Sequence, residues 1–217
     1  MKISVHNPLI LELQTEEVFY CCRRFEPSGV APEISWPKKS SSLVGRLLHG
    51  ALWPNRLRTK DENRKVDFRA AEGHRFVALW LETGETLCFH YHSLVGFSSN
   101  ISLSTYISLQ FTTLCLNRIF FHLATGPGLV VLESKGVPEV FQNAAPDKAI
   151  PPVRLLCWSI ETEFAIEGSG KFADIFMSPV FLRPLTSTAV VIDADDPRIQ
   201  SSRFLWNILR KIYTPGL

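Results

Sequence analysis

Short apolar runs, and runs that alternate apolar with polar residues, fill most of this 217-residue chain. Gly, Pro, Asn or Ser bound most of them, which is the pattern of strands joined by turns. The predicted strands are Ile3–Val5, Leu9–Leu13, Val18–Cys22, Phe76–Leu81, Thr86–Tyr91, Leu94–Phe97, Ile101–Leu109, Ile119–Ala124, Leu129–Leu132, Val153–Trp158, Phe164–Ile166, Ile175–Met177 and Thr188–Ile192. Turn signals separate them about as often as in a sandwich or barrel. The pattern therefore predicts a single all-β domain over residues 1–195, built as a sandwich-like barrel.

The end of the chain has a different pattern, which predicts an amphipathic helix over residues 196–217. Asp195-Asp196-Pro197 supplies an acidic cap with proline in the first turn. Apolar residues then recur at helical spacing: Ile199, Phe204, Leu205, Ile208, Leu209 and Ile212. Such a stripe could pack on the β core, dock on another subunit or protein partner, or lie on a membrane surface as a peripheral contact.

Residues 26–63 break the strand rhythm and are predicted to form an irregular basic excursion from the domain. This stretch contains four prolines and a run of serines. Within it, Ser42–Trp53 could form a short helix, although its two glycines weaken that prediction.

The net charge of +2 hides an uneven distribution. Ten Lys or Arg and only four Asp or Glu lie between Lys38 and Arg75. The candidates for contact with an anion are Lys38, Lys39, Arg56, Arg58, Lys60, Arg64 and Lys65. A basic segment can bind phosphates or anionic lipid, and nucleic-acid binding of this kind weakens steeply with salt. The alternative is a solvated loop face, because acids interrupt the run and no aromatic-glycine signature for RNA accompanies it.

Composition and cysteine content favour a globular protein without membrane spans or structural disulfides. Hydrophobic residues make up 46% of the chain and charged residues 20%, as in globular proteins. No run reaches the roughly 18 apolar residues of a membrane span, and the first residues lack the pattern of a signal peptide. Of the five cysteines, Cys88, Cys115 and Cys157 lie in apolar runs, where a thiol acts as a small hydrophobe. We therefore expect a cytoplasmic protein without structural disulfides.

Residues 84–92 hold the sharpest candidate for a metal site. They read Gly-x5-His-x-His, which opens the metal motif of cupins, where alternate residues of one strand aim two imidazoles into a barrel. His90 and His92 would be the ligands, with His122 as the later histidine. The acid expected shortly after His92 is missing. Exposed or hydrogen-bonded strand histidines are therefore the alternative, and we expect no metal or other cofactor.

Motifs for catalysis are also missing, since the sequence contains no recognised nucleophile elbow, phosphate loop or dinucleotide fingerprint. Glu161, Glu163 and Glu167 alternate along a possible strand and are interpreted as a solvated edge. Asp193, together with the acids that follow it, is interpreted as the cap of the predicted helix. We therefore expect the protein not to be an enzyme.

Gly126-Pro127-Gly128 raises the question of a ligand cradle, because successive glycines expose backbone N–H groups to an anion. Pro127 has no N–H to donate, and no helix start follows to add its dipole. The triplet is therefore predicted to be a structural turn, in which glycine takes φ values that other residues resist.

A weak internal echo links Leu94–Ser98 (LVGFS) with Leu155–Ser159 (LLCWS), 61 residues further along the chain. Each pairs branched aliphatic residues with an aromatic residue and then a serine. The echo indicates two related β units stacked on each other.

Two longer stretches resemble a known family. Residues 73–97 and 120–136 are similar to the altered-inheritance-of-mitochondria family of mitochondrial biogenesis proteins and its bacterial relatives. Its leucine-glycine-glutamate turn, leucine-valine strand and Gly-Pro-Gly strand have counterparts in Leu81–Leu87, Leu94–Phe97 and Gly126–Ser134. The resemblance implies a double-stranded β-helix fold akin to the tryptophan RNA-binding attenuation proteins, commonly homo-oligomeric. It implies no established catalytic activity, and the yeast member is associated with the mitochondrial inner membrane.

These observations lead to three hypotheses. The first is a non-enzymatic, homo-oligomeric β scaffold that binds another protein or a membrane-associated assembly. The second is nucleic-acid binding through the basic segment of residues 38–75. The third is a cupin-like metal-dependent enzyme built on His90 and His92.

Overall fold

The computed structural model describes residues 1–13, 18–22, 33–34, 55–58, 64–107, 120–141, 149–167, 181–186 and 190–193. The regular elements in these ranges are β-strands and two short 3₁₀ helices, η1 (Tyr91–Ser93) and η2 (Pro152–Arg154). This confirms the prediction of an all-β protein. The predicted helix over residues 196–217 and the predicted strand Ile175–Met177 lie outside the described residues.

The strands form two large antiparallel sheets and two ribbons of two strands each. The seven-stranded sheet has the order β1 (Lys2–His6), β7 (His74–Leu81), β12 (Gly128–Lys135), β9 (Leu94–Ser98), β3 (Val18–Cys21), β5 (Asn55–Arg58) and β4 (Glu33–Ile34). The six-stranded sheet has the order β10 (Ser102–Ile107), β11 (Phe120–Thr125), β8 (Thr86–Phe89), β14 (Leu155–Ser159), β17 (Val190–Ile192) and β13 (Glu139–Phe141). The ribbons are β2 (Leu9–Leu13) with β6 (Arg64–Phe68), and β15 (Phe164–Glu167) with β16 (Phe181–Pro184).

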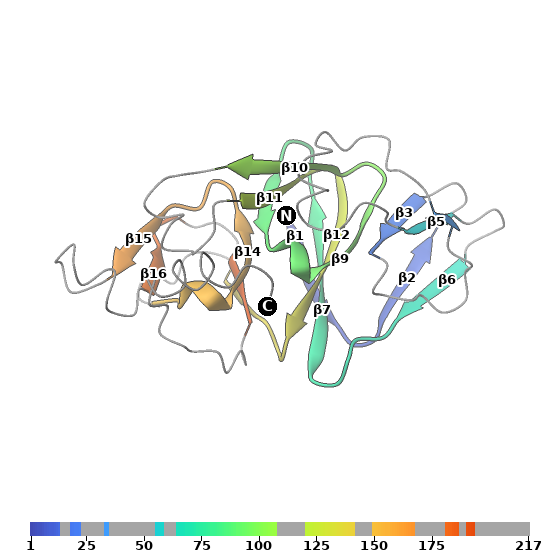
Figure 1. Ribbon diagram of the computed structural model, residues 1–217, viewed down its shortest axis with the longest axis horizontal. Coiled ribbons are helices and arrows are strands. Elements are labelled where there is room, and N and C mark those ends of the chain that lie inside the picture. Colours follow the sequence, from blue (N-terminus) through green and yellow to red (C-terminus); the bar gives the residue numbers. More distant parts are fainter. Residues whose placement is uncertain are drawn as a thin grey trace, which may run out of the picture.

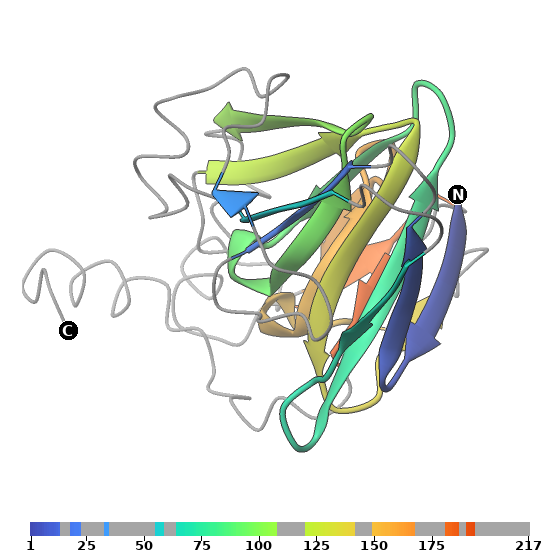
Figure 2. The same ribbon diagram turned by 90° about the vertical axis from the view of Figure 1, so that its right-hand side faces the viewer.

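These elements stack in four layers, with a ribbon on the outer side of each sheet (Figures 1 and 2). The central apolar cluster lies between the sheets and joins side chains such as Leu79 of β7 and Phe89 of β8. The first ribbon buries Phe68 against the outer face of the larger sheet. The second ribbon places Leu182 in one cluster with Trp158 of the smaller sheet. Both faces of each sheet are therefore covered near its centre.

Strand β7 shows how its sequence fits this position. Phe76, Val77, Ala78 and Leu79 are all buried, although successive side chains of a strand point to opposite faces. Val77 and Leu79 belong to the central cluster, whereas Phe76 and Ala78 lie under the first ribbon. A strand covered on both faces requires a continuous apolar run rather than alternation.

The two sheets share one pairing scheme. In the larger sheet, β9 and β12 pair Phe97 with Val130, Gly96 with Val131 and, after a bulge, Leu94 with Leu132. In the smaller sheet, β14 and β17 pair Trp158 with Val190, Cys157 with Val191 and, after a bulge, Leu155 with Ile192. A 3₁₀ helix precedes both β9 and β14. The echo between Leu94–Ser98 and Leu155–Ser159 therefore marks two core strands in equivalent places.

Strands β4, β5, β6, β13 and β16 were not predicted from the sequence. Of these, β4 and β5 fall within residues 26–63, so part of the predicted excursion belongs to the larger sheet. Strand β6 illustrates why such strands escape a pattern search. It buries Val66 and Phe68 on one face and exposes Lys65 on the other. Because the other residues of β6 are charged, the strand has only one apolar face and does not stand out as an apolar run in the sequence.

We predict that Gly96→Ala destabilises the fold, because a Cβ at this position would lie 2.5 Å from the backbone oxygen of Tyr20 and would also collide with the ring of Phe19. Overpacking of this kind costs about 1–3 kcal/mol of unfolding free energy. Urea unfolding followed by circular dichroism measures the loss. Gly84→Asn is the comparison variant, since that glycine has open space around it and any loss there comes from its positive φ alone, which asparagine tolerates better than most residues. Equal stability of Gly96→Ala and the wild type would contradict the close packing of β3 on β9.

Candidate interaction surface

The Gly126-Pro127-Gly128 triplet joins β11 to β12, which confirms the predicted structural turn. Gly128 has φ +146°, in the region that favours glycine. The N–H of Gly126 donates to the carbonyl of Glu85 over 3.0 Å. A Cβ on Gly126 would collide with the backbone of Glu82. The triplet is therefore packed tightly against the turn that joins β7 to β8.

His90 and His92, the candidates of the cupin-like motif, do not alternate along one strand. Strand β8 ends at Phe89, which leaves His90 beyond the strand and His92 in η1. His90 lies edge-on to the ring of Trp158 at 6.0 Å between ring centres, whereas His92 is exposed. His122 is buried on β11, opposite Phe89. In the part of the chain that the structure describes, no group of three or more His, Cys, Asp or Glu is placed to hold a metal ion.

Of the seven basic residues proposed to contact an anion, four lie on two strands and three lie outside the residues that the structure describes. Arg56 and Arg58 lie on β5, and Arg64 and Lys65 lie on β6. Lys38, Lys39 and Lys60 lie outside the described residues. The Lys65 ammonium pairs with the Glu12 carboxylate across the first ribbon at 2.9 Å, which raises the pKa of Lys65 and lowers that of Glu12. Nucleic-acid binding by this segment stays a prediction.

Buried thiols confirm the packing role expected of Cys88 and Cys157; Cys115 lies outside the described residues. Burial raises the pKa of Cys157 well above its usual value, and the pKa of Cys21 to about 12. A thiol held protonated in this way is a poor nucleophile. These cysteines therefore act as buried packing residues of the core.

One end of the sandwich gathers the turn after β7, the turn after β14 and the end of β16. The backbone N–H of Ile160 donates to the carbonyl of Thr86 over 3.0 Å, which joins the first two turns. The Thr186 hydroxyl accepts from the N–H of Glu163 over 3.1 Å, and the N–H of Leu185 donates to the Glu163 carbonyl over 2.8 Å. We call the side chains carried here the acidic rim: Glu82, Glu85, Ile160, Glu161, Glu163 and Leu185.

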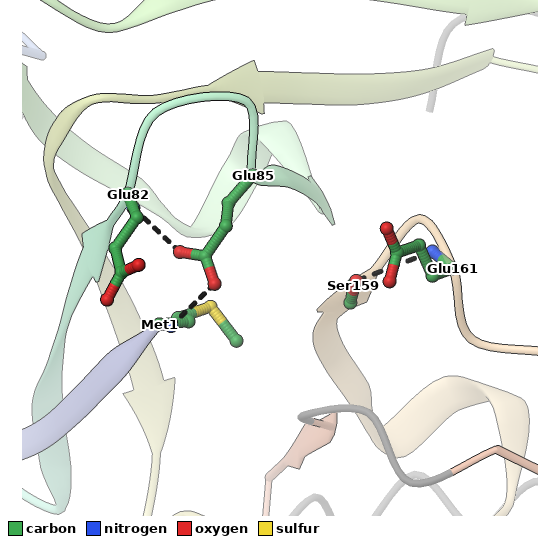
Figure 3. Close-up of polar contacts among 5 residues, drawn as sticks. All are labelled: Met1, Glu82, Glu85, Ser159 and Glu161. Carbon is green, nitrogen blue, oxygen red and sulfur yellow. Dashed lines mark hydrogen bonds and ion pairs between the residues drawn. The ribbon is translucent and has the colours of Figure 1, made fainter.

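Glu85 anchors its turn electrostatically. Its carboxylate accepts hydrogen bonds from the backbone N–H of Glu82, at 2.7 Å, and from the Met1 ammonium (Figure 3). Partial burial raises the pKa of Glu85, but the Glu82 hydrogen bond and the Met1 ammonium outweigh it and hold the pKa below its usual value. On the neighbouring turn, the N–H of Glu161 donates to the Ser159 hydroxyl over 3.4 Å (Figure 3).

The acidic rim combines negative charge with exposed apolar groups. Ile160 is 50% exposed and Leu185 is 56% exposed, and Glu82, Glu161 and Glu163 of the same end of the sandwich are exposed as well. Residues 82–86, 125–128, 159–163 and 185–186 contain no Lys or Arg. Such a surface is complementary to a partner that carries both apolar and basic side chains.

The opposite end of the sandwich is held by Asp193, directly after β17. Its carboxylate accepts hydrogen bonds from the Ser134 hydroxyl and from the N–H of Lys135, both on β12. Its backbone N–H donates to the Arg154 carbonyl over 2.8 Å, and its own carbonyl accepts from Arg154 Nε over 2.6 Å. Asp193 therefore ties the smaller sheet to the larger one. No local motif marks this contact, because its partners on β12 are far from Asp193 in the sequence, where the run of acids indicates only a helix cap.

Comparison with known proteins shows a likeness in fold to a solved structure. No protein-family model and no curated protein matches the chain. Among solved structures, the chain is similar to the X-ray crystal structure of protein SPYM3_0169 from Streptococcus pyogenes, with a TM-score of 0.61 and 11% sequence identity. The match covers 98% of this chain and 99% of that chain. At this identity the likeness shows a shared fold alone. Among the described residues, no helix is long and apolar enough to cross a membrane.

We predict that Glu85→Gln lowers stability at neutral pH and flattens its dependence on acid. The folded pKa of Glu85 lies below its ordinary value of 4.5, so the carboxylate stabilises the fold above pH 4.5. This contribution disappears as the pH falls through the folded pKa. Because the group is partly exposed, the loss at pH 7 should be below about 1 kcal/mol.

Urea unfolding at pH 7 and at pH 3 measures the difference between the Glu85→Gln variant and the wild type, which should shrink at the lower pH. Glu161→Gln is the matched control, because its carboxylate makes no hydrogen bond to the residues that the structure describes. A difference that is the same at both pH values would exclude a stabilising role for the Glu85 charge.

Proposed function

We propose that this protein is a non-enzymatic β scaffold that forms a homo-oligomer and binds another protein or a membrane-associated assembly. The observation that carries the proposal is the acidic rim, in which Ile160 and Leu185 are exposed among carboxylates. Backbone hydrogen bonds fix the rim to the ends of buried strands, so its side chains are held by rigid elements before any partner arrives. Preorganisation reduces the conformational cost of binding.

The proposal includes membership of the altered-inheritance-of-mitochondria family and its double-stranded β-helix, sandwich-like barrel fold. Support comes from the Gly-Pro-Gly turn between two core strands and from the pairing scheme that both sheets share. A cytoplasmic location, with peripheral membrane contact, also belongs to the proposal. Its support is that Cys21, Cys88 and Cys157 are buried in the apolar core, where a cysteine packs as a small hydrophobe.

The predicted helix over residues 196–217 is the second part of the proposed binding apparatus. Its apolar stripe needs a surface to cover it, which a protein would supply, either another copy of this chain or a different partner. Support for this assignment comes from its sequence, since the segment combines apolar spacing with basic residues.

The oligomer is the part of the proposal that can be tested first. We expect light scattering on the purified chain at micromolar concentration to give a mass that is a multiple of 24.5 kDa. The mass should decrease on dilution if association is reversible, because the equilibrium follows protomer concentration. A strict monomer at all micromolar concentrations would contradict the proposed assembly.

A further inference from the structure

The sequence that follows Asp193 complements the acidic rim in charge and character. From Pro197 to Leu217 it carries Arg198, Arg203, Arg210 and Lys211 and no acidic residue. The rim carries four carboxylates, offset by the Met1 ammonium on Glu85. The segment also provides apolar residues at helical spacing, and the rim exposes Ile160 and Leu185. Each surface therefore offers the charge and the apolar groups that the other lacks.

Asp193 is the last described residue before the basic segment, and its position relative to the acidic rim can be read from β12. Asp193 is bonded to Lys135 at the last residue of β12. The rim lies at the other end, where Gly128 begins β12 beside the turn after β7. The eight residues of β12 span about 23 Å at a strand rise of about 3.3 Å per residue. Asp193, after which the chain continues into the basic segment, and the rim thus lie at opposite ends of β12.

We propose that residues 196–217 of one copy dock on the acidic rim of a second copy. This inference rests on the proposed homo-oligomer and names the contact that builds it. The apolar stripe covers Ile160 and Leu185, and the cations lie against Glu82, Glu161 and Glu163. Because the two surfaces differ, the contact is heterologous and either closes into a ring or continues as a string of copies.

Charge reversal on full-length chains tests this contact. The rim variant is Glu82→Lys/Glu161→Lys/Glu163→Lys, which changes only exposed side chains. The tail variant is Arg203→Glu/Arg210→Glu/Lys211→Glu. Sedimentation velocity at low salt gives the mass of each variant alone and of their equimolar mixture, and circular dichroism checks that each is folded.

We expect each variant alone to associate at least about tenfold more weakly than the wild type, because like charges then face each other. Mixing should restore association, since a native tail meets a native rim and a reversed tail meets a reversed rim. Raising the salt concentration should weaken the wild-type assembly. Glu72→Lys, on an exposed turn before β7 and away from the rim, should leave association unchanged.

Three other outcomes are decisive. If either variant keeps the wild-type mass, the oligomer stands but this contact does not build it. If both variants are monomeric and their mixture stays monomeric, the tail does not dock on a second copy. If the wild type is itself monomeric, the proposed oligomer and this contact both fail.

Discussion

Exclusion of water from both faces of each sheet is the constraint on which the rest of the structure depends. The central strands are apolar on both sides, and burial contributes about 25 cal/mol for each Å² of apolar surface removed from water. One sheet packed on another covers only the inner faces. The two ribbons cover the outer faces, and this is why β2, β6, β15 and β16 are needed. The acidic rim and the Asp193 contact are then set by where the packed strands end.

The equivalent centres of the two sheets differ in one instructive position. Gly96 of β9 and Cys157 of β14 hold the same place in the shared pairing scheme. In the larger sheet the ring of Phe19 occupies the space that a side chain at Gly96 would need. In the smaller sheet the Cys157 thiol fills that place and is fully buried. The two units thus keep one backbone arrangement while their cores are filled from different strands.

How much the sequence predicts depends on how completely each strand is buried. The runs in β7, β9, β12 and β14 were found because both of their faces are apolar. Strand β6 was missed because three of its five residues are charged, and β16 because Arg183 and Pro184 interrupt a run of only two apolar residues. His90 and His92 do not share a strand for a local reason, since the chain turns into η1 directly after His90. The Ser134–Asp193 contact joins residues 59 positions apart, so it follows from sheet register and cannot be seen in any short motif.

The order in which the chain visits the two sheets has a consequence for how the protein forms. Strand β8 of the smaller sheet comes between β7 and β9 of the larger one, and β12 returns to the larger sheet after β10 and β11. No single cut in the chain therefore separates one sheet from the other. Among the strands that the structure describes, β17 comes last, so the edge of β14 that pairs with it stays open until β17 has been synthesised. Completion of the smaller sheet therefore depends on pairings between residues far apart in the sequence, which are intrinsically slow to form.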